Sequence, residues 1–437
     1  MKISIIGAGY VGLVSAAFLA GKNDIICYDK NKEKIDMLNN GIIPIYEKGL
    51  EELIKTNKDR LTYTCEKQLA YKDVDIIFIC VGTPEGKEGL ADLKYIYEVA
   101  DDIILNINKD CIIVIKSTVP VGTNYEIENY INEKIKEKYR IEIASNPEFL
   151  SQGTAVNDTL NAERIVIGTH STEVRDILKK IYSDLTDANI LCTDINSAEM
   201  IKYASNSFLA LKISYINEIA NLCEKLGSNI DDVSKGMGLD SRIGNKFLNA
   251  GIGYGGSCLP KDTKALYSFS KIAGCEMTTI RDTMQINENQ SLKLIEKLKK
   301  YYHSFENLNI AILGVAFKPE TDDLRNSPAV KNIEILKSKG ANIKIWDLLA
   351  TDNLKESIKN MVIYCDTIDE TIKDTDACLI FTDWKQIKEY DIKRYKQLMN
   401  TPIVLDGRNC YNLSEVENTS ITYESIGRNT LMKKKKV

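Results

Sequence analysis

One cysteine of this sequence stands in a setting suited to covalent catalysis. Cys258 lies in the run Gly253-Tyr-Gly-Gly-Ser-Cys-Leu-Pro-Lys-Asp262. Glycines let the backbone approach a ligand, and free backbone N–H groups and a neighbouring ammonium such as that of Lys261 stabilise a thiolate. The carboxylate of Asp262 can accept a proton or orient a water molecule. The run therefore predicts a nucleophilic cysteine, although a glycine turn beside a buried, unreactive cysteine would fit the same letters.

A long helix predicted over residues 197–226 carries two further polar candidates. Lys202 and Asn206 are four residues apart, which puts their side chains on one face of the helix. A surface lysine and a tolerated asparagine are the alternative. The helix is predicted to begin at a capping signature formed by Asn196 and Glu199.

Two apolar rows on this helix predict that it is covered on more than one side. The first row consists of positions 201, 204, 208, 211, 215, 219, 222 and 226, and the second consists of Leu209, Ile213, Ile216, Ala220 and Cys223. A helix that is apolar on more than one face is buried between domains or subunits. A dimer contact is the simplest interpretation.

The elements that must position a substrate beside Cys258 begin at the N-terminus with a dinucleotide-binding pattern. A strand at 2–6 leads into Gly7-Ala-Gly-Tyr-Val-Gly12, then a helix, then a strand that ends at Asp29. The first glycine allows a tight turn, the second admits a pyrophosphate, and the third lets helix and strand pack closely. Asp29 would accept hydrogen bonds from the adenosine ribose and repel a 2′-phosphate, which predicts NAD rather than NADP. The neighbouring Lys30 counts against this prediction, because its ammonium could accept a 2′-phosphate.

Two later strands, predicted at 74–81 and 111–117, end in polar loops that contain Thr83 and Thr118. Ligands of such folds bind at the carboxyl ends of the strands. Ordinary turn chemistry would also explain both threonines.

A second strand-led pattern starts at Leu308–Gly314, and strands recur at 342–346, 376–381 and 402–405 with helices between them. It lacks a GxGxxG motif, so we expect it to bind something other than a second dinucleotide. The expected fold is therefore α/β, with two Rossmann-like, doubly wound parallel-sheet domains joined by a long central helix. The expected divisions are 1–195, 196–300 and 301–437, and Lys433–Lys436 is expected to be a solvated tail.

The composition narrows the class of partner. Lys and Arg number 57 against 62 Asp and Glu, a net charge of −5, which leaves no basic surface for nucleic acid or an anionic membrane. Eleven single cysteines without a CxxC pair indicate reduced thiols, and two isolated histidines give little material for a metal site, so none is expected. The chain enters a strand at once, and no apolar run approaches ~20 residues. A cytoplasmic location is expected.

The whole pattern resembles the UDP-glucose 6-dehydrogenase family, in order, over residues 1–425. The similarity is carried by Gly7–Gly12, the loop at 146–155, the helix segment Glu199–Ala210, the run from Arg242 to Asp262, and Phe317–Arg325. It implies a four-electron oxidation of the sugar C6 alcohol to a carboxylate with two NAD, through a thiohemiacetal and a thioester on Cys258. It also implies that the C-terminal domain binds the UDP moiety and that the chain forms a homodimer.

The resemblance implies roles for particular side chains. Lys202 and Asn206 would hold oxyanions, and Asp262 and Thr118 would order the hydrolytic water with help from Glu148. Cofactor contacts are implied for Gly7, Gly9, Tyr10, Val11, Gly12, Asp29, Lys34, Thr83, Thr118, Gln152, Lys261 and Arg325. Substrate contacts are implied for Glu148, Phe149, Leu150, Ser151, Gln152, Lys202, Asn206, Arg242, Phe247, Leu248, Asn249, Ala250, Gly251, Tyr254, Gly255, Lys318 and Arg408. Arg242 would act on the partner subunit.

The sequence departs from the family pattern in two places, and the sugar stays open. Gln152 stands where a second glutamate is usual, and Asn161-Ala replaces the common Asn-Pro. Related enzymes oxidise GDP-mannose or UDP-N-acetylmannosamine by the same steps. Gly256-Ser-Cys differs from the Gly-Gly-His-Cys form of the N-acetylhexosamine enzymes, and Glu163–Gly168 differs from the GDP-mannose form, so UDP-glucose is favoured. A nucleotide-sugar sensor without catalysis is the remaining alternative.

Overall fold

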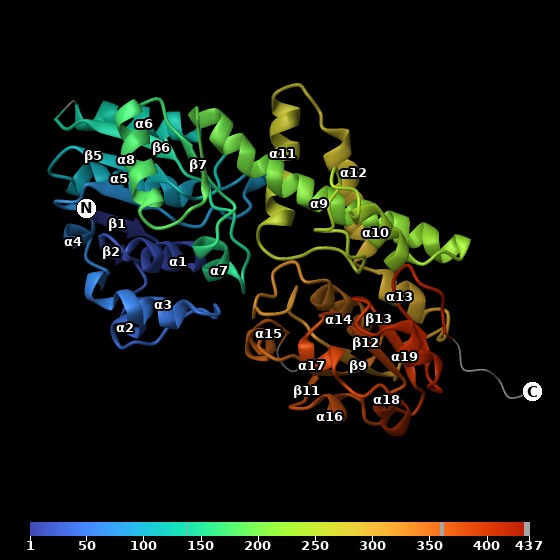
Figure 1. Ribbon diagram of the computed structural model, residues 1–437. Coiled ribbons are helices and arrows are strands. Elements are labelled where there is room, and N and C mark those ends of the chain that lie inside the picture. Colours follow the sequence, from blue (N-terminus) through green and yellow to red (C-terminus); the bar gives the residue numbers. More distant parts are fainter. Residues whose placement is uncertain (137, 359–361, 432–437) are drawn as a thin grey trace, which may run out of the picture. The chain divides into compact units, whose positions relative to one another are not determined.

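The computed structural model describes residues 1–136, 138–358 and 362–431 (Figure 1). The chain forms two compact units, Met1–Ser205 and Asn206–Val437, called here the first and second unit. The lysine run Lys433–Lys436 lies outside the described residues. The predicted division into three domains stays a prediction.

The first unit is built on an eight-stranded sheet in the order β3-β2-β1-β4-β5-β6-β7-β8, parallel except for the antiparallel pair β6 and β7. Its strands are β1 (Lys2–Ile6), β2 (Asp24–Tyr28), β3 (Leu61–Thr64), β4 (Ile76–Ile79), β5 (Cys111–Ile115), β6 (Ile141–Ser145), β7 (Arg164–Gly168) and β8 (Asn189–Thr193). Its helices are α1 (Tyr10–Leu19), α2 (Lys32–Asn39), α3 (Leu50–Asn57), α4 (Lys67–Tyr71), α5 (Lys94–Asn106), α6 (Thr123–Ile135), α7 (Ala155–Leu160) and α8 (Thr172–Ser183), with 3₁₀ turns at Lys58–Arg60 and Lys87–Gly89.

Both faces of this sheet are covered, because side chains that alternate along each strand enter two separate apolar clusters. Ile3 and Ile5 of β1 pack with α1 and α3, whereas Ile6 packs with α4 and α5. The strand order reverses direction at β1, where Ile6 is aligned with Tyr28 on one side and Ile79 on the other. Nucleotides bind such sheets at this point, outside the carboxyl ends of the strands.

The second unit repeats this topology in a sheet of six parallel strands, in the order β11-β10-β9-β12-β13-β14. Its strands are β9 (Asn309–Leu313), β10 (Asn342–Trp346), β11 (Ile363–Tyr364), β12 (Ala377–Ile380), β13 (Ile403–Asp406) and β14 (Thr422–Glu424). Its helices after the central one are α10 (Ile230–Gly238), α11 (Leu259–Ile272), α12 (Thr278–Gln290), α13 (Lys293–Leu298), α14 (Pro328–Ser338), α15 (Thr351–Ile358), α16 (Ile368–Ile372), α17 (Lys385–Lys388), α18 (Lys393–Leu398) and α19 (Leu413–Glu417).

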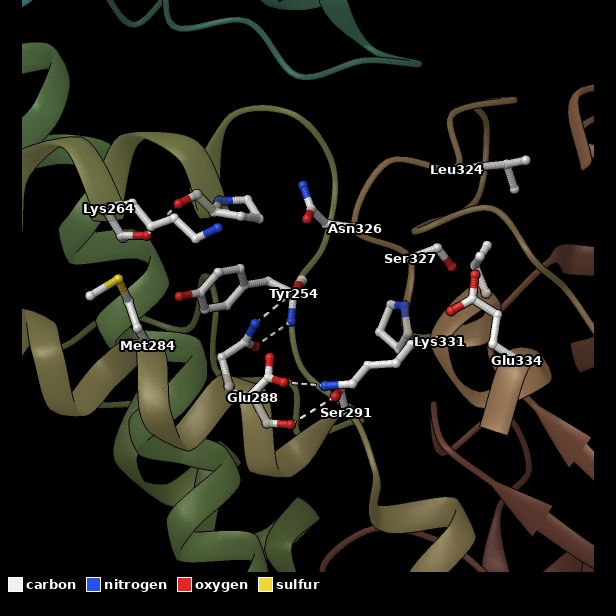
Figure 2. Close-up of a pocket in the computed structure, with 15 residues that line it drawn as sticks. Tyr254, Lys264, Met284, Glu288, Ser291, Leu324, Asn326, Ser327, Lys331 and Glu334 are labelled. Carbon is white, nitrogen blue, oxygen red and sulfur yellow. Dashed lines mark hydrogen bonds and ion pairs between the residues drawn. The ribbon is translucent and has the colours of Figure 1, made fainter. Parts of the chain in front are cut away.

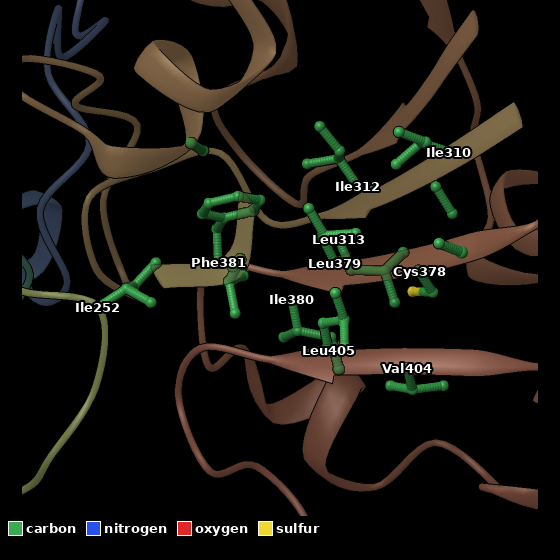
Figure 3. Packing of buried hydrophobic residues seen from close by; sticks show 14 of the residues in the cluster. Ile252, Ile310, Ile312, Leu313, Cys378, Leu379, Ile380, Phe381, Val404 and Leu405 are labelled. Atoms are coloured by element: carbon green, nitrogen blue, oxygen red, sulfur yellow. The ribbon is translucent and has the colours of Figure 1, made fainter. Parts of the chain in front are cut away.

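The core of the second unit reaches from the sheet to the glycine-rich run that precedes Cys258. Figure 3 shows strand residues such as Ile312 and Leu379 with Ile252, which lies in that run. Ile252 is fully buried, and a Cβ on Gly407 would lie only 2.8 Å from its side chain. The sheet therefore supports the run directly.

The long helix α9 (Ile195–Leu226) is present and 32 residues long, but the predicted N-terminal cap is wrong. Asp194 caps it instead, because its carboxylate accepts from the Ser197 N–H at 2.8 Å and from the Ser197 hydroxyl at 2.6 Å. The predicted partner Glu199 is buried and accepts from the backbone N–H groups of Gly122 and Asn124, at 2.6 and 2.9 Å. Glu199, which the local pattern had assigned to the helix cap, therefore makes a tertiary contact instead.

The predicted fold class is confirmed by the two doubly wound sheets and the long helix. The helix ends as expected, since Gly227 is left-handed with φ +78 and donates to the Cys223 carbonyl at 2.8 Å. Within the described ranges, no helix combines the length and apolar character that crossing a membrane requires.

Candidate active site

The glycine loop between β1 and α1 has the geometry of a phosphate-binding turn. Gly7 has φ +106, and a Cβ on Gly12 would lie 1.7 Å from the Gly7 carbonyl oxygen, so both positions require glycine. A Cβ on Gly9 would meet nothing within 4 Å. Open space therefore lies beside Gly9, at the N-terminus of α1, where Tyr10 and Val11 begin the helix. This arrangement fits the pyrophosphate of a dinucleotide.

Asp29 at the end of β2 both shapes this loop and faces a cation. Its carboxylate accepts from the N–H groups of Ala8 and Asn31, each at 2.9 Å, and lies 3.5 Å from the Lys34 ammonium. A carboxylate has further acceptor capacity for ribose hydroxyls. Lys30 is engaged elsewhere, with Glu98 at 2.9 Å. The cation that faces the Asp29 carboxylate is therefore Lys34 and not Lys30.

The loops after β4 and β5 are joined to each other. The Thr83 hydroxyl donates to the Thr118 carbonyl at 2.7 Å, and the Ser117 hydroxyl donates to the Val81 carbonyl at 2.6 Å. The two threonines predicted as cofactor contacts thus lie together at the carboxyl edge of the sheet.

Glu148 and Lys202 form a buried ion pair in the first unit. The Lys202 ammonium lies 3.0 Å from the Glu148 carboxylate and donates to the Glu148 carbonyl at 2.6 Å. Burial opposes ionisation of Glu148, but Lys202, the Leu150 N–H and Lys116 together hold its pKa below the usual value. The Glu148 carboxyl therefore ionises at a lower pH than an ordinary glutamate.

The loop that contains Glu148 is held by a residue that the sequence did not single out. Glu47 is buried and accepts from the N–H groups of Gly153 and Ala155, at 2.8 and 2.9 Å. Ser151 donates its N–H to Asp158 at 2.9 Å, and Gln152 lies half-buried between these anchors. Phe149 is covered by a cation, with the Arg164 guanidinium 4.1 Å from its ring centre.

In the second unit, Cys258 is exposed and occupies the N-cap of α11. The positive end of a helix favours a thiolate. Asp262 follows one turn later, almost fully buried, and accepts from the Asn206 amide at 2.6 Å and from the Lys261 ammonium at 2.5 Å. The structure thus places Asn206, Lys261 and Asp262 in one hydrogen-bonded group at the start of the helix that carries Cys258.

The remaining predicted substrate contacts fall into two groups within the second unit. Arg408 lies against the glycine-rich run, where its guanidinium donates to the carbonyls of Phe381, Gly253 and Phe317 at 2.8, 3.0 and 3.2 Å. Lys318 lies over the Phe317 ring at 5.6 Å. Arg242 is 87% exposed and pairs with Asp240. Arg325, which was predicted as a cofactor contact, is also exposed and pairs with Asp323.

Other members of the predicted substrate set lie on the segment between α10 and Cys258. Phe247 is partly exposed and has φ +65, an unusual conformation for an aromatic residue. Leu248, Gly251, Tyr254 and Gly255 are buried, whereas Asn249 is exposed and Ala250 is half-buried.

Two residues join the candidate set only through the structure. The Lys116 ammonium donates to the Asn146 side chain at 3.1 Å, and burial lowers the pKa of Lys116. Phe317 approaches Gly256 so closely that a Cβ there would lie 2.9 Å from its ring. Lys116 could have been found from its position between β5 and Thr118. Phe317 lies at the start of the segment Phe317–Arg325, but no local pattern predicted its contact with Gly256.

The chain matches three family models of the UDP-glucose/GDP-mannose dehydrogenase family. The NAD binding domain matches residues 1–186, the central domain matches residues 196–289, and the UDP binding domain matches residues 311–413. The dinucleotide that the glycine loop and Asp29 fit is therefore NAD, as predicted.

Curated and solved relatives match over nearly the whole chain. A UDP-glucose 6-dehydrogenase of Bacillus subtilis is 44% identical over 98% of this chain and 93% of its own length. The solved UDP-glucose dehydrogenase of Pyrobaculum islandicum is 33% identical, with a TM-score of 0.90, and the alignment covers 97% of this chain and 96% of that one. A UDP-D-ManNAc dehydrogenase structure from Pyrococcus horikoshii is 26% identical with a TM-score of 0.86, covering 98% and 99%.

Proposed function

The chain belongs to the UDP-glucose/GDP-mannose dehydrogenase family, and from this membership we propose that it oxidises the C6 alcohol of UDP-glucose to the carboxylate of UDP-glucuronate. The observation that carries the proposal is the exposed Cys258 at the N-terminus of α11, in a chain that also has the NAD-binding glycine loop. When bound, NAD accepts one hydride in each of the two oxidations.

The proposed role of Cys258 is to hold the sugar between the two oxidations. Its thiolate adds to the C6 aldehyde, which forms a C–S bond and an oxyanion. Loss of the second hydride from C6 leaves a thioester. Water then adds to C6, the C–S bond breaks, Cys258 departs as a thiolate, and the carboxylate product remains. The aldehyde is thereby never released to solvent.

The charged side chains have proposed roles in the same steps. Lys202 and Asn206 stabilise the oxyanions, and their place one turn apart on α9 supports a shared task. Asp262 orients the hydrolytic water and takes its proton, with Thr118 and Glu148 assisting. Arg408 and Lys318 contact the nucleotide sugar.

The function is tested by following NADH absorbance on mixing the protein with NAD and each nucleotide sugar in turn. We expect two NADH per UDP-glucose consumed, and little turnover of GDP-mannose or UDP-N-acetylmannosamine. A protein that binds UDP-glucose and NAD but forms no NADH would be a sensor. Faster turnover of GDP-mannose or UDP-N-acetylmannosamine would show that this nucleotide sugar is the substrate of the same reaction.

Cofactor choice is predicted to depend on Asp29. A 2′-phosphate about 4 Å from a carboxylate meets roughly 4 kcal/mol of repulsion at an effective dielectric constant of about 20, which Lys34 partly offsets. We therefore expect kcat/KM to favour NAD over NADP by on the order of a hundredfold. Asp29→Ser should narrow this ratio. Equal rates with the two cofactors in the unsubstituted protein would contradict the assignment.

We propose a homodimer from the face of α9 that the second unit leaves uncovered. Phe208, Tyr215, Leu222 and Leu226 are 58%, 47%, 52% and 71% exposed, while Ile216, Ala220 and Cys223 of the other row are buried. The exposed side chains repeat every seven residues from 208 to 222, along about 21 Å of helix. Such a stripe fits a second copy of itself. By the same proposal, Arg242 reaches the UDP phosphates of the partner subunit.

The dimer is predicted to separate when this stripe receives a charge. Leu222→Glu should give a monomer in sedimentation velocity with reduced activity, because two glutamates would meet in an apolar contact. Leu105→Glu is the matched control, since Leu105 is an exposed leucine on α5, outside α9, and should leave the mass unchanged. A monomeric unsubstituted protein with full activity would contradict both the dimer and the role of Arg242.

We also propose a cytoplasmic location. All eleven cysteines lie in the described part of the chain and carry free thiols, which suits a reducing compartment.

A further inference from the structure

The glycine-rich segment Gly251–Gly256 is buried although it forms neither helix nor strand. Buried backbone N–H and C=O groups need hydrogen-bond partners, and an irregular segment cannot supply them from its own ladder. The partners therefore have to come from other elements.

The Arg325 carbonyl accepts from the Gly256 N–H at 2.8 Å, and Arg408 donates to the Gly253 carbonyl at 3.0 Å. Four side-chain amides supply further partners, and we call these four residues the carboxamide cradle. Gly251 donates its N–H to Asn217 at 2.8 Å and accepts from Gln290 at 2.6 Å. Asn326 donates to the Gly256 carbonyl at 3.0 Å. Asn287 of α12 makes two bonds with one residue, accepting from the Tyr254 N–H at 2.8 Å and donating to the Tyr254 carbonyl at 3.0 Å.

The glycines of this segment make room for the cradle. A Cβ on Gly253 would lie 2.5 Å from the Asn287 side-chain oxygen, and a Cβ on Gly255 would lie 2.4 Å from the Asn326 carbonyl oxygen. Real Cβ atoms do not come so close, so a side chain at Gly253 would displace the Asn287 amide and one at Gly255 would displace the backbone of Asn326. The sequence suggested that these glycines let the backbone approach a ligand. At Gly253 and Gly255 the groups that approach the backbone are instead Asn287 and Asn326 of the same chain.

We propose that Asn287 is a positioning residue for Cys258, acting through the backbone on both sides of Tyr254. The Tyr254 N–H and C=O belong to the two peptide groups on either side of its Cα, and the Asn287 side chain bonds to both. The backbone reaches Cys258 four residues later. The far end is fixed too, because Asp262 donates its N–H to the Cys258 carbonyl at 2.9 Å. Cys258 thus lies between two anchored points, the Tyr254 backbone before it and its own carbonyl, which is bonded to the Asp262 N–H. This proposal rests on the proposed function, in which Cys258 is the nucleophile.

A cavity lies beside the segment, where Asn287 and Arg408 hold the backbone around Tyr254. Tyr254 lines a cavity of about 310 Å³. Figure 2 shows Tyr254 at this cavity, with dashed lines for hydrogen bonds beside it; its two bonds to Asn287 are those given above. Pro260 and Thr263 of α11 line the same space. A peptide beside a cavity has room to move once its hydrogen bonds are removed, and a displacement of about 1 Å can reduce a rate about a hundredfold.

The test compares Asn287→Ala with Asn332→Ala. Asn332 is a matched control because it is buried in the same unit and its amide donates to two carbonyls, those of Ser291 and Pro328, each at 2.7 Å. We expect Asn287→Ala to lower kcat about tenfold to a hundredfold. Asn332→Ala should lose thermal stability to a similar extent but keep its kcat per folded molecule. Asn287→Asp retains the acceptor for the Tyr254 N–H, so its kcat should lie between those of the unsubstituted protein and Asn287→Ala.

A second readout is independent of the substrate. The rate of iodoacetamide alkylation at Cys258, followed by peptide mass spectrometry, should change about threefold or more in Asn287→Ala, with the exposed Cys65 and Cys275 as internal standards. If the protein oxidises no nucleotide sugar, the proposed function fails while this rate still reports on the cradle. Should Asn287→Ala not fold, Asn287→Asp takes its place. Equal kcat and equal Cys258 alkylation in the Asn287 and Asn332 variants would overturn the proposal.

Discussion

Cys258→Ser should abolish net turnover while leaving NAD and UDP-glucose binding nearly unchanged. A serine hydroxyl is far less acidic than a thiol, whose reference pKa is about 8.5, so little alkoxide forms at the N-terminus of α11 to add to the aldehyde. Any ester that does form is hydrolysed more slowly than a thioester. The sugar should therefore remain attached to the protein or stop at the aldehyde level.

Two measurements separate this outcome from its alternatives. Intact-protein mass spectrometry after incubation looks for the trapped adduct, and steady-state NADH formation gives the rate. If water instead hydrated a free aldehyde with Asp262 as base, Cys258→Ser would retain near-normal turnover, and that result would sink the thioester mechanism. A cysteine that merely filled space would be buried, whereas Cys258 is exposed.

Lys202→Met should reduce both catalysis and stability, because the same ammonium serves both. Its removal leaves the Glu148 carboxylate buried without its partner, a change that costs about 3–5 kcal/mol in comparable pairs. Loss of a preorganised oxyanion donor lowers kcat by about 10²–10³-fold. Urea unfolding and steady-state kinetics measure the two effects on one preparation.

Lys297→Met is the control that separates the two effects. Lys297 is also buried and paired with carboxylates, those of Glu224 at 2.8 Å and Glu424 at 3.5 Å, but it lies on α13. It should lose stability and retain its kcat per folded molecule. A Lys202 variant that behaved in the same way would assign Lys202 to structure alone.

The pH dependence gives the sign of the Glu148 contribution. Its pKa is lower in the folded protein than in the unfolded chain, so the pair stabilises the fold above the usual glutamate pKa. That stabilisation is lost as the pH falls through the lowered folded-state pKa. In Lys202→Met the main cause of the lowering is gone, so this acid-side loss of stability should largely disappear. An unchanged acid unfolding profile would contradict the assignment.

The elements that use local chemistry were predictable from the sequence. Gly7 and Gly227 have conformations that few other residues adopt, and Gly12 stands where a side chain would not fit, so residue type and spacing were sufficient. Asp29 was predictable from its carboxylate and its position at the end of the next strand. Cys258 was also found from local letters, the glycines before it and the Lys261 and Asp262 after it, and from the family resemblance of this run, whereas its place at the N-cap of α11 came from the structure.

What only the tertiary structure decided are the contacts between residues far apart in the chain. Glu199 looked like a capping partner because a cap needs residues three apart, but it bonds instead to Gly122 and Asn124, more than seventy positions away. Glu47, Asn287 and Gln290 belong to no motif in the sequence around them. They matter because buried irregular backbone elsewhere required donors and acceptors, and the fold brought these side chains to it.

Helix α9 shows where the two kinds of information divide. Periodicity in the sequence established two apolar rows, because side chains 3.6 residues apart share a face whatever surrounds them. It could not establish which row the chain itself would cover, since that depends on the elements packed against the helix. The structure buries Ile216, Ala220 and Cys223 of one row in the core of the second unit and leaves Phe208 and Leu222 of the other row exposed.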